Sequence, residues 1–226
     1  MPIRAVAFDV DGTLYPNAVM YLASVPFFLS RPRLMRAFGR VRRAIRRVRP
    51  IEDFYDLQAR MLAQELGVDA EDARGMISRR IYPEAERVLS VVPRFPHVRE
   101  TVERLRAAGM KVGLLSDFPL GDKLRRLGVE GLWDARVEAE QVGYLKPHPE
   151  PFRAVLDALG SEAGETLYVG NNYAYDVLGA GAVGMHTAHL TARPQQGSAA
   201  DLSFFCYRAL ASWVLDREIR EENRAL

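Results

Sequence analysis

Two aspartates separated by one residue, Asp9 and Asp11, are the side chains of this 226-residue chain best placed to do chemistry. They follow the apolar run of residues 3–8, which predicts a buried strand, so both carboxylates should lie at its carboxyl end. Alternate residues of an extended chain point to the same side, and a bound divalent cation or a retained proton would relieve the repulsion between the two charges. Either arrangement serves catalysis. The same Asp-x-Asp-Gly pattern is also typical of a solvated turn in which Gly12 has a positive φ angle.

Three further strand ends carry polar side chains of the kinds that phosphoryl transfer uses. Ser116 follows the apolar residues 111–115, Lys146 precedes a proline, and Asn171 follows another apolar strand, with Asp176 in the next turn. Each has a structural explanation on its own, because serine and aspartate often cap helices and a lysine is usually solvated. Their joint occurrence in this order favours one shared site.

The elements that must position these residues alternate regularly between strand and helix outside residues 16–90. Apolar runs predict strands at residues 3–8, 111–115 and 167–169, and the alternating series adds strands at residues 135–137 and 186–189. Helices are expected between them at residues 98–108, 123–127, 151–159 and 176–182, and from residue 207 onward. This alternation predicts an α/β fold with a Rossmann-like parallel sheet and helices on both faces. Ligands of such sheets bind at the carboxyl ends of the strands, where the candidate residues fall.

A block that is helical throughout interrupts this pattern after the first strand. The spacing of apolar residues, with an N-cap at Asp69, predicts helices at residues 33–48, 52–66 and 69–81. We therefore expect a small all-helical domain formed by residues 16–90, inserted into an α/β core formed by residues 1–15 and 91–226.

With these motifs the sequence resembles the haloacid dehalogenase superfamily of hydrolases. Asp9–Thr13 match its first motif, Ser116 its second, Lys146 with Pro147 its third, and Asn171–Asp176 the position and length of its fourth. The resemblance extends over nearly the whole chain. It implies that the helical block is the cap domain that these enzymes insert between their first two motifs. The set of motifs is specific for the superfamily and weak for the substrate.

The resemblance implies roles for four catalytic residues. Asp9 would attack phosphorus to form an aspartyl-phosphate that water then hydrolyses, and Asp11 would protonate the leaving oxygen and later activate that water. Ser116 would bind a phosphoryl oxygen, and Lys146 would offset negative charge on the nucleophile and the phosphate. The implied activity is hydrolysis of a small phosphate monoester.

The resemblance also implies Mg²⁺ as cofactor, held by the Asp9 carboxylate, the Asp11 backbone carbonyl and the fourth-motif residues Asn171 and Asp176. The superfamily usually has aspartate at the position of Asn171, whose amide oxygen can bind a metal but adds no negative charge. We therefore expect weaker magnesium binding, with Asp176 as the only carboxylate of the fourth motif. Asp117, at a position often occupied by asparagine, would partly compensate.

Four residues near these motifs are expected to contact the substrate, namely Gly12, Thr13, Tyr15 and Asp117. Tyr15 is equally well interpreted as a packing residue with an exposed hydroxyl. Dehalogenases and phosphonate-cleaving relatives lack the second aspartate, so Asp11 favours a phosphatase. Thr13 favours it too, because sugar phosphomutases usually carry a bulkier aliphatic residue there. A phosphomutase or a dehalogenase of the same superfamily stays open as an alternative.

Charge is concentrated in one segment, since residues 12–51 contain nine arginines and no acidic residue in a chain of net charge +2. Most of these arginines flank the apolar line of one predicted helix, formed by Leu34, Phe38, Val41, Ile45 and Val48. The favoured interpretation is a helix packed on its neighbours with a solvated arginine face. Two alternatives are arginines that line the mouth of the site, and a weakly active binding module that contacts a membrane surface through Arg33–Arg49.

The amino-acid composition of the whole chain, with 48% hydrophobic residues, is that of a globular protein. The single cysteine, Cys206, allows no internal disulfide and fits a reducing compartment. The N-terminus lacks the pattern of a secretory signal, and the apolar residues 18–29 are too few to span a membrane. We expect a cytoplasmic protein whose partner is a small phosphorylated metabolite, with no nucleic acid. No motif specifies the natural substrate or the oligomeric state.

Overall fold

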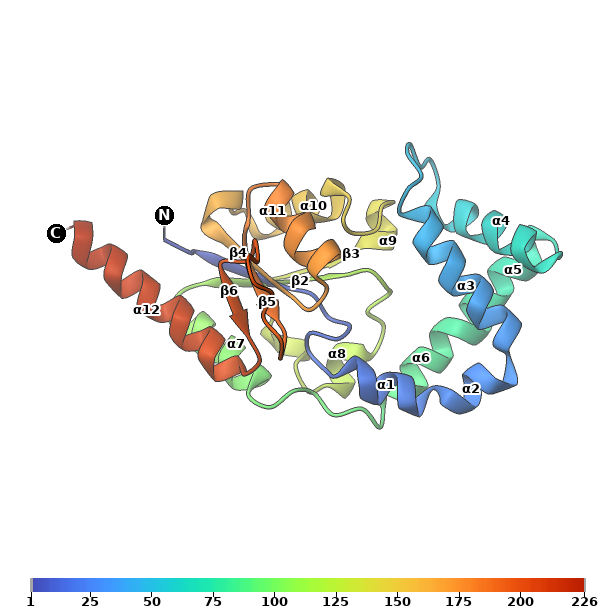
Figure 1. Ribbon diagram of the computed structural model, residues 1–226, viewed down its shortest axis with the longest axis horizontal. Coiled ribbons are helices and arrows are strands. Elements are labelled where there is room, and N and C mark those ends of the chain that lie inside the picture. Colours follow the sequence, from blue (N-terminus) through green and yellow to red (C-terminus); the bar gives the residue numbers. More distant parts are fainter. Residues whose placement is uncertain (1, 226) are drawn as a thin grey trace.

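The computed structural model describes the backbone of residues 2–225 and the side chains of residues 2–217. Its centre is a sheet of parallel strands in the order β3-β2-β1-β4-β5-β6 (Figure 1). These strands are β1 (Ala5–Phe8), β2 (Lys111–Ser116), β3 (Ala135–Glu138), β4 (Thr166–Gly170), β5 (His186–Leu190) and β6 (Leu202–Phe204). Because β1 pairs with β2 on one side and β4 on the other, the chain connections diverge there and leave a crevice at the carboxyl ends of these strands.

Helices cover both faces of the sheet, which confirms the predicted α/β fold (Figure 1). One face is covered by α9 (Ala139–Val142), α10 (Pro149–Leu159) and α11 (Leu178–Ala182), and the other by α7 (Val98–Ala107), α8 (Lys123–Arg126) and α12 (Tyr207–Ala225). Short 3-10 turns at Glu130–Leu132 and Ala163–Glu165 and a π-helical turn at Tyr173–Val177 complete this part. The central strands are buried on both faces, which explains their continuous apolar runs.

A run of helices lies between β1 and α7, and we call residues 17–89 the helical insertion. Its helices are α1 (Asn17–Ala23), α2 (Val25–Ser30), α3 (Pro32–Ile45), α4 (Phe54–Leu66), α5 (Ala70–Met76), a π-helical stretch (Ile77–Ile81) and α6 (Tyr82–Leu89). Figure 1 shows the insertion at one end of the molecule, beyond the carboxyl ends of the strands. The all-helical character expected for this segment is therefore observed.

The caps of the insertion follow from its sequence. The side chain of Asp69 accepts a hydrogen bond from the backbone N–H of Asp72 (2.7 Å), which confirms its prediction as an N-cap. α3 begins with Pro32, which needs no hydrogen bond at that position, and ends at Ile45 rather than at residue 48. The helix expected at residues 69–81 continues to Leu89 through the π-helical stretch.

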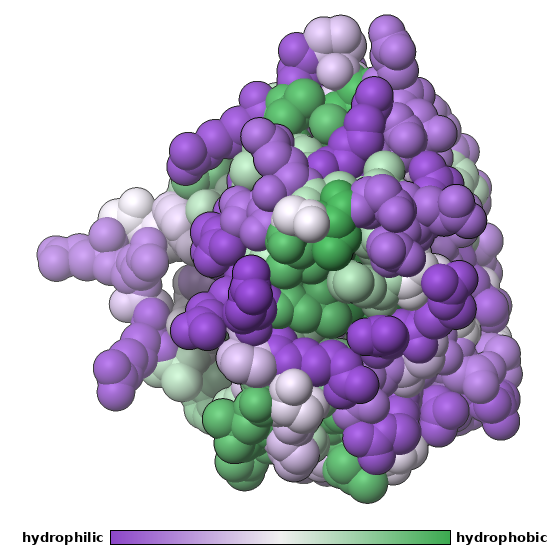
Figure 2. All heavy atoms as spheres, turned by 90° about the vertical axis from the view of Figure 1, so that its right-hand side faces the viewer, coloured by the Kyte–Doolittle hydropathy of each residue, from purple (hydrophilic) through white to green (hydrophobic). Residues whose placement is uncertain are grey.

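The arginine-rich face of α3 is not solvated throughout, and in this respect the favoured interpretation was wrong. Arg42 is only 5% exposed, and the side chain of Arg46 is 12% exposed. Both contact the α/β core, whereas Arg33, Arg36 and Arg43 are exposed as expected. Figure 2 shows this end of the molecule, where hydrophilic side chains surround a hydrophobic area. Membrane contact through the exposed arginines stays a prediction.

The apolar line of α3 is divided between two cores. Leu34, Phe38 and Val41 pack within the insertion against residues of α4 and α5. Ile45 belongs to the cluster on one face of the sheet, together with Phe54. The insertion therefore packs directly on the α/β core.

The strand β6 differs from the sequence-based expectation, and the loop at residues 193–200 agrees with it. The short strand β6 was not predicted, because three residues are too few to give a periodic pattern. Residues 193–200 contain neither helix nor strand, as expected. Among the described residues, every helix is either too short or too polar to cross a lipid bilayer.

Candidate active site

Four predicted catalytic residues come together at the carboxyl ends of β1 and β2. Asp9 directly follows β1, and its backbone N–H donates to the Val169 carbonyl of β4 (2.8 Å). Ser116 is the last residue of β2 and is fully buried. Lys146 reaches the same place from the segment between α9 and α10, and Asp11 lies in the turn after β1. The topology of the sheet thus gathers groups that lie far apart in the sequence.

Asp9 is buried, at 4% exposure, and each of its carboxylate oxygens has a partner. Oδ1 accepts a hydrogen bond from Nζ of Lys146 (2.7 Å), and Oδ2 accepts one from the hydroxyl of Thr13 (2.8 Å). Burial raises the pKa of Asp9 to about 7; Lys146 opposes this rise, and the charges of Asp176 and Asp11 add to it. The side chain is therefore held in one orientation and binds a proton more readily than an ordinary aspartate.

The ammonium group of Lys146 donates hydrogen bonds to three side chains. Its Nζ donates to Oδ1 of Asp9, to Oδ1 of Asp176 (2.6 Å) and to the hydroxyl of Tyr168 (3.0 Å). Burial by itself would lower the pKa of Lys146, but the carboxylates of Asp176 and Asp9 raise it well above its usual range. The group therefore stays an ammonium ion beside the candidate nucleophile. Tyr168 was not predicted, since it lies in the apolar run of β4.

Asp11 is held by three donors. Its carboxylate accepts hydrogen bonds from Nζ of Lys123 (2.8 and 3.1 Å), from the hydroxyl of Ser116 (3.2 Å) and from the hydroxyl of Tyr15. Burial alone would raise the pKa of Asp11, but the ammonium of Lys123 and these hydrogen bonds together lower it below its usual value. Without substrate, Asp11 is therefore a carboxylate.

Lys123 is the main residue of the site that sequence reasoning missed. It is the first residue of α8, and its side chain is only 4% exposed. The one available signal was its position at a helix N-terminus, where a cation opposes the helix dipole. In a helix of four residues that signal is weak.

Tyr15 is fully buried and its hydroxyl binds Asp11, so the expectation of an exposed hydroxyl was wrong. Burial, followed by the negative charge of Asp11, raises the pKa of Tyr15 far above its usual range. The hydroxyl therefore keeps its proton and acts as a donor. Its predicted contact with substrate stays a prediction.

Asp117 faces the insertion. Its Oδ2 lies 2.7 Å from Nη2 of Arg46, and its Oδ1 accepts a hydrogen bond from the backbone N–H of Lys146 (3.1 Å). Its backbone carbonyl accepts a hydrogen bond from Nη2 of Arg42 (2.6 Å), whose Nη1 pairs with the buried Glu140. The carboxylate of Asp117 thus has structural partners, and a contact with substrate would require the Arg46 pair to open.

Each of the two fourth-motif residues, Asn171 and Asp176, shares a hydrogen-bond partner with Asp9. Oδ1 of Asn171 is 3.3 Å from the hydroxyl of Thr13, which also binds Asp9. Asp176 is buried, and its two oxygens bind Lys146 and the backbone N–H of Asn172 (2.9 Å). A Cβ on Gly12, whose φ angle is +89°, would lie 2.6 Å from Nδ2 of Asn171, so this glycine permits the close approach.

The side-chain oxygens of Asp9 and Asn171 fit a magnesium ion whose other ligands come partly from substrate and water. Among the described residues, three or more His, Cys, Asp or Glu side chains nowhere gather into a metal-binding cluster. Mg²⁺ is usually held by only one or two carboxylates, with water and substrate phosphate completing its octahedron. Asp9 and Asn171 offer oxygens next to one another around Thr13, which suits this mode.

Comparison with known proteins identifies the family of the chain. Residues 3–184 match the family described as haloacid dehalogenase-like hydrolase. The chain is 29% identical over 203 residues to glyceraldehyde 3-phosphate phosphatase of Methanopyrus kandleri, covering 83% of this chain and 84% of the relative. It is 30% identical over 206 residues to phosphoglycolate phosphatase of Pectobacterium atrosepticum, covering 89% and 86%.

The fold is similar to that of L-2-haloacid dehalogenase from Xanthobacter autotrophicus, with a TM-score of 0.68 and 21% identity over 94% of this chain and 98% of that one. At this identity the likeness concerns the fold alone. The family match, in contrast, spans most of the sequence and includes the three strand ends and the segment between α9 and α10 that carry the site. The chain therefore belongs to the haloacid dehalogenase-like hydrolases.

Proposed function

We propose that this protein is a magnesium-dependent phosphatase that hydrolyses a small phosphate monoester through an aspartyl-phosphate on Asp9. The observation that carries the proposal is a pair of neighbouring carboxylates with different surroundings, Asp9 being buried and Asp11 partly exposed. Asp9 is oriented by Lys146 and Thr13, while Asp11 is oriented by Lys123. Such a pair supplies a nucleophile and a separate acid and base. The phosphatase names of the sequence relatives support the same activity.

Asp9 would attack phosphorus in line, and its bond to phosphorus would replace the bond to the leaving oxygen. Lys146 would orient Asp9 and offset negative charge, while Ser116 would turn its hydroxyl from Asp11 to a phosphoryl oxygen. The incoming phosphate, being negative, would raise the proton affinity of Asp11, which would take up a proton from solvent and then pass it to the leaving oxygen. Asp11 would afterwards take a proton from the water that hydrolyses the intermediate.

Mg²⁺ would be held by Asp9, the backbone carbonyl of Asp11, Asn171 and Asp176. When bound, it would neutralise charge on the transferring phosphoryl group. Since Asn171 is neutral and Asp176 already binds Lys146, we expect weak affinity for the metal before substrate arrives.

We also propose that residues 16–90 form a cap domain over a core of residues 1–15 and 91–226. This proposal is supported by Arg42 and Arg46. Both belong to the insertion, and both bind Asp117 in the loop after β2. A cap in this position would exclude bulk water during transfer. The free Cys206 is consistent with the proposed cytoplasmic location.

The proposal is tested by phosphate release from p-nitrophenyl phosphate, phosphoglycolate and glyceraldehyde 3-phosphate, each with magnesium and with EDTA. We expect turnover that requires magnesium and is lost in Asp9→Asn. A parallel assay with 2-chloropropionate distinguishes phosphatase from dehalogenase chemistry. Chloride release without any phosphate release would overturn the proposal.

A further inference from the structure

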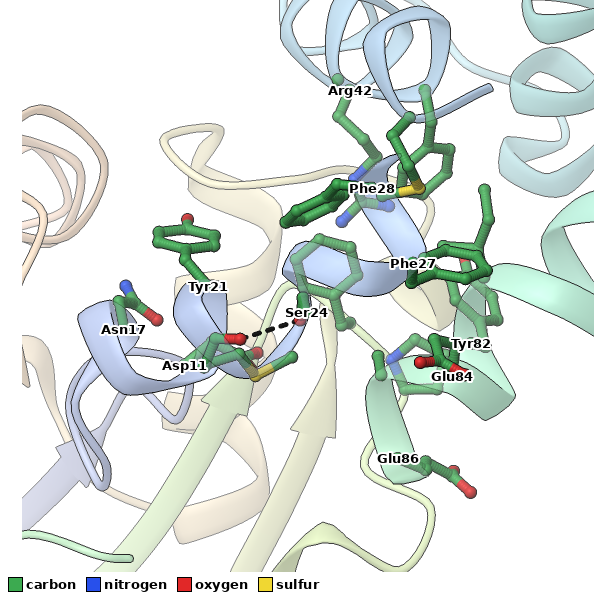
Figure 3. Close-up of a pocket in the computed structure, with 18 of the residues that line it drawn as sticks. Asp11, Asn17, Tyr21, Ser24, Phe27, Phe28, Arg42, Tyr82, Glu84 and Glu86 are labelled. Atoms are coloured by element: carbon green, nitrogen blue, oxygen red, sulfur yellow. Dashed lines mark hydrogen bonds between the residues drawn. The ribbon is translucent and has the colours of Figure 1, made fainter. Parts of the chain in front are cut away.

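A cavity of about 340 Å³ lies beside Asp11, between the helical insertion and the core (Figure 3). Its walls come from α1, α2, α3 and α6 and from the loop after β2. Most of the lining is apolar and includes Met20, Phe27, Phe28, Met35, Phe38 and Phe118. Figure 3 shows Phe27, Phe28 and Tyr82 around one space, with Asp11 at the side nearest the strands. This is the size and character of a small-molecule pocket.

Asp11 connects this cavity with the catalytic groups. It lines the cavity, whereas Asp9, Ser116 and Lys146 do not. In the proposed reaction the phosphoryl group lies at Asp9, and Asp11 gives its proton to the leaving oxygen. The remainder of the leaving group must therefore continue past Asp11, and the cavity is the space that receives it.

The charged groups of the lining leave no cation free for a second anionic group on the substrate. The ammonium of Lys123 pairs with Asp11, and the guanidinium of Arg42 pairs with Glu140. Arg42 also lies 4.1 Å from the ring centre of Phe118. The other charged side chains of the lining are two carboxylates: Glu84 pairs with Arg87, and Glu86 would repel an anion.

The guanidinium of Arg42 offers no group to the substrate. Its Nη1 and Nη2 bind Glu140 and the backbone carbonyl of Asp117. Its Nε is buried under protein atoms, so a molecule in the cavity does not reach it. The lining therefore selects for a leaving group that is uncharged and predominantly apolar.

We infer that the substrate is a phosphate monoester whose leaving group is uncharged and predominantly apolar, with about six to ten carbons. The number of carbons follows from the volume of the cavity, because a cavity of about 150 Å³ is large enough to hold benzene. This inference rests on the proposed phosphatase function and specifies the substrate class of that site.

Ethyl, butyl and hexyl phosphate provide the first test, because their leaving alcohols have similar acidity and differ mainly in apolar surface. We expect kcat/KM to rise roughly 3- to 4-fold for each added methylene, as the burial of one methylene predicts. Phenyl phosphate should also exceed 4-carboxyphenyl phosphate by at least about 10-fold, since the carboxylate finds no free cation. Equal values along the alkyl series would overturn the inference.

Gly39 allows the cavity to be filled without disturbing the backbone. It lies on α3 in the lining, and the nearest atom to an added Cβ outside the helix backbone is Nη1 of Arg43, at 3.8 Å. Gly39→Leu should lower kcat/KM for hexyl phosphate at least about 10-fold more than for ethyl phosphate. Gly131→Leu is the control, because a Cβ there meets nothing within 4 Å and the residue lies outside the cavity. It should leave the hexyl-to-ethyl ratio unchanged.

Binding to the Asp9→Asn protein separates this inference from the proposed function. Calorimetry in the presence of magnesium should show tighter binding of hexyl than of ethyl phosphate, and Gly39→Leu in the same background should remove the difference. If no ester is hydrolysed but this preference is present, the proposed function fails and the assigned pocket stands. If esters are hydrolysed and neither rate nor binding depends on chain length, the inference fails and the phosphatase stands.

Discussion

Nζ of Lys123 lies 2.8 Å from Oδ1 of Asp11, although 112 positions separate the two residues in the chain. The lysine is buried, and both residues line the apolar cavity next to the catalytic centre. An opposite charge at this distance favours the ionised carboxylate. Lys123 therefore acts on the proposed reaction by setting the position and the proton affinity of Asp11.

Replacing this cation should change the pH dependence of turnover. In Lys123→Met the pKa of Asp11 rises, because the ammonium that lowers it is gone while burial remains. The acidic limb of the kcat profile should move to higher pH by about one unit or more, with kcat lower by about 10- to 100-fold. Lys123→Arg should recover part of the loss. Arg125→Met, which removes an exposed cation from the same helix, serves as control; a profile unchanged in Lys123→Met would contradict the assigned role.

Adding a carboxylate to the fourth motif should strengthen magnesium binding. Asn171→Asp places a negative charge next to Asp9 and is expected to lower the magnesium concentration for half-maximal activity by about 10-fold. Asn172→Asp adds the same charge one residue away, where the side chain caps the following turn by accepting from the backbone N–H of Tyr175. Equal half-saturation in Asn171→Asp and the parent would remove the idea that Asn171 weakens metal binding.

The carboxylate of Asp9 should destabilise the metal-free protein at neutral pH. Because burial raises its pKa from 3.8 to about 7, the folded protein holds a proton there that the unfolded chain releases. This contribution to stability is fully present below the unfolded pKa and is lost as pH rises through the folded one. In EDTA, the Tm of Asp9→Asn relative to the parent should therefore increase by at least about 2 °C from about pH 5 to about pH 8. A Tm difference that does not change with pH would argue against this account.

The Arg42 and Glu140 pair should hold the insertion to the core. Both side chains are buried, and Tyr82 of α6 also donates to Glu140 (2.8 Å). Arg42→Met leaves Glu140 buried without its cation and should lower the free energy of unfolding by about 3–5 kcal/mol. The double variant Arg42→Met with Glu140→Leu should recover most of this loss, since no buried charge is left unpaired. Urea unfolding of the single and double variants measures the coupling, and simple additivity would show that the pair is not coupled.

The sequence was sufficient for the architecture and for the grouping of polar residues at the strand ends. Apolar runs and their alternation with helical segments identified five of the strands and implied a parallel sheet. In such a sheet all carboxyl ends meet at one edge, so Asp9, Ser116 and Asn171 had to lie near one another once their strands were recognised. These conclusions need only local periodicity and one general rule of topology.

Contacts that depend on side-chain placement across distant segments were decided by the tertiary structure alone. Nothing local distinguishes Arg42 and Arg46 from the exposed arginines beside them on α3, or marks Lys123 as the partner of Asp11. The apolar cavity likewise exists only because the insertion packs against the loop after β2. A residue's neighbours along the chain determine the element it forms. Its burial and its partners depend on how the elements pack, and that packing is a property of the whole molecule.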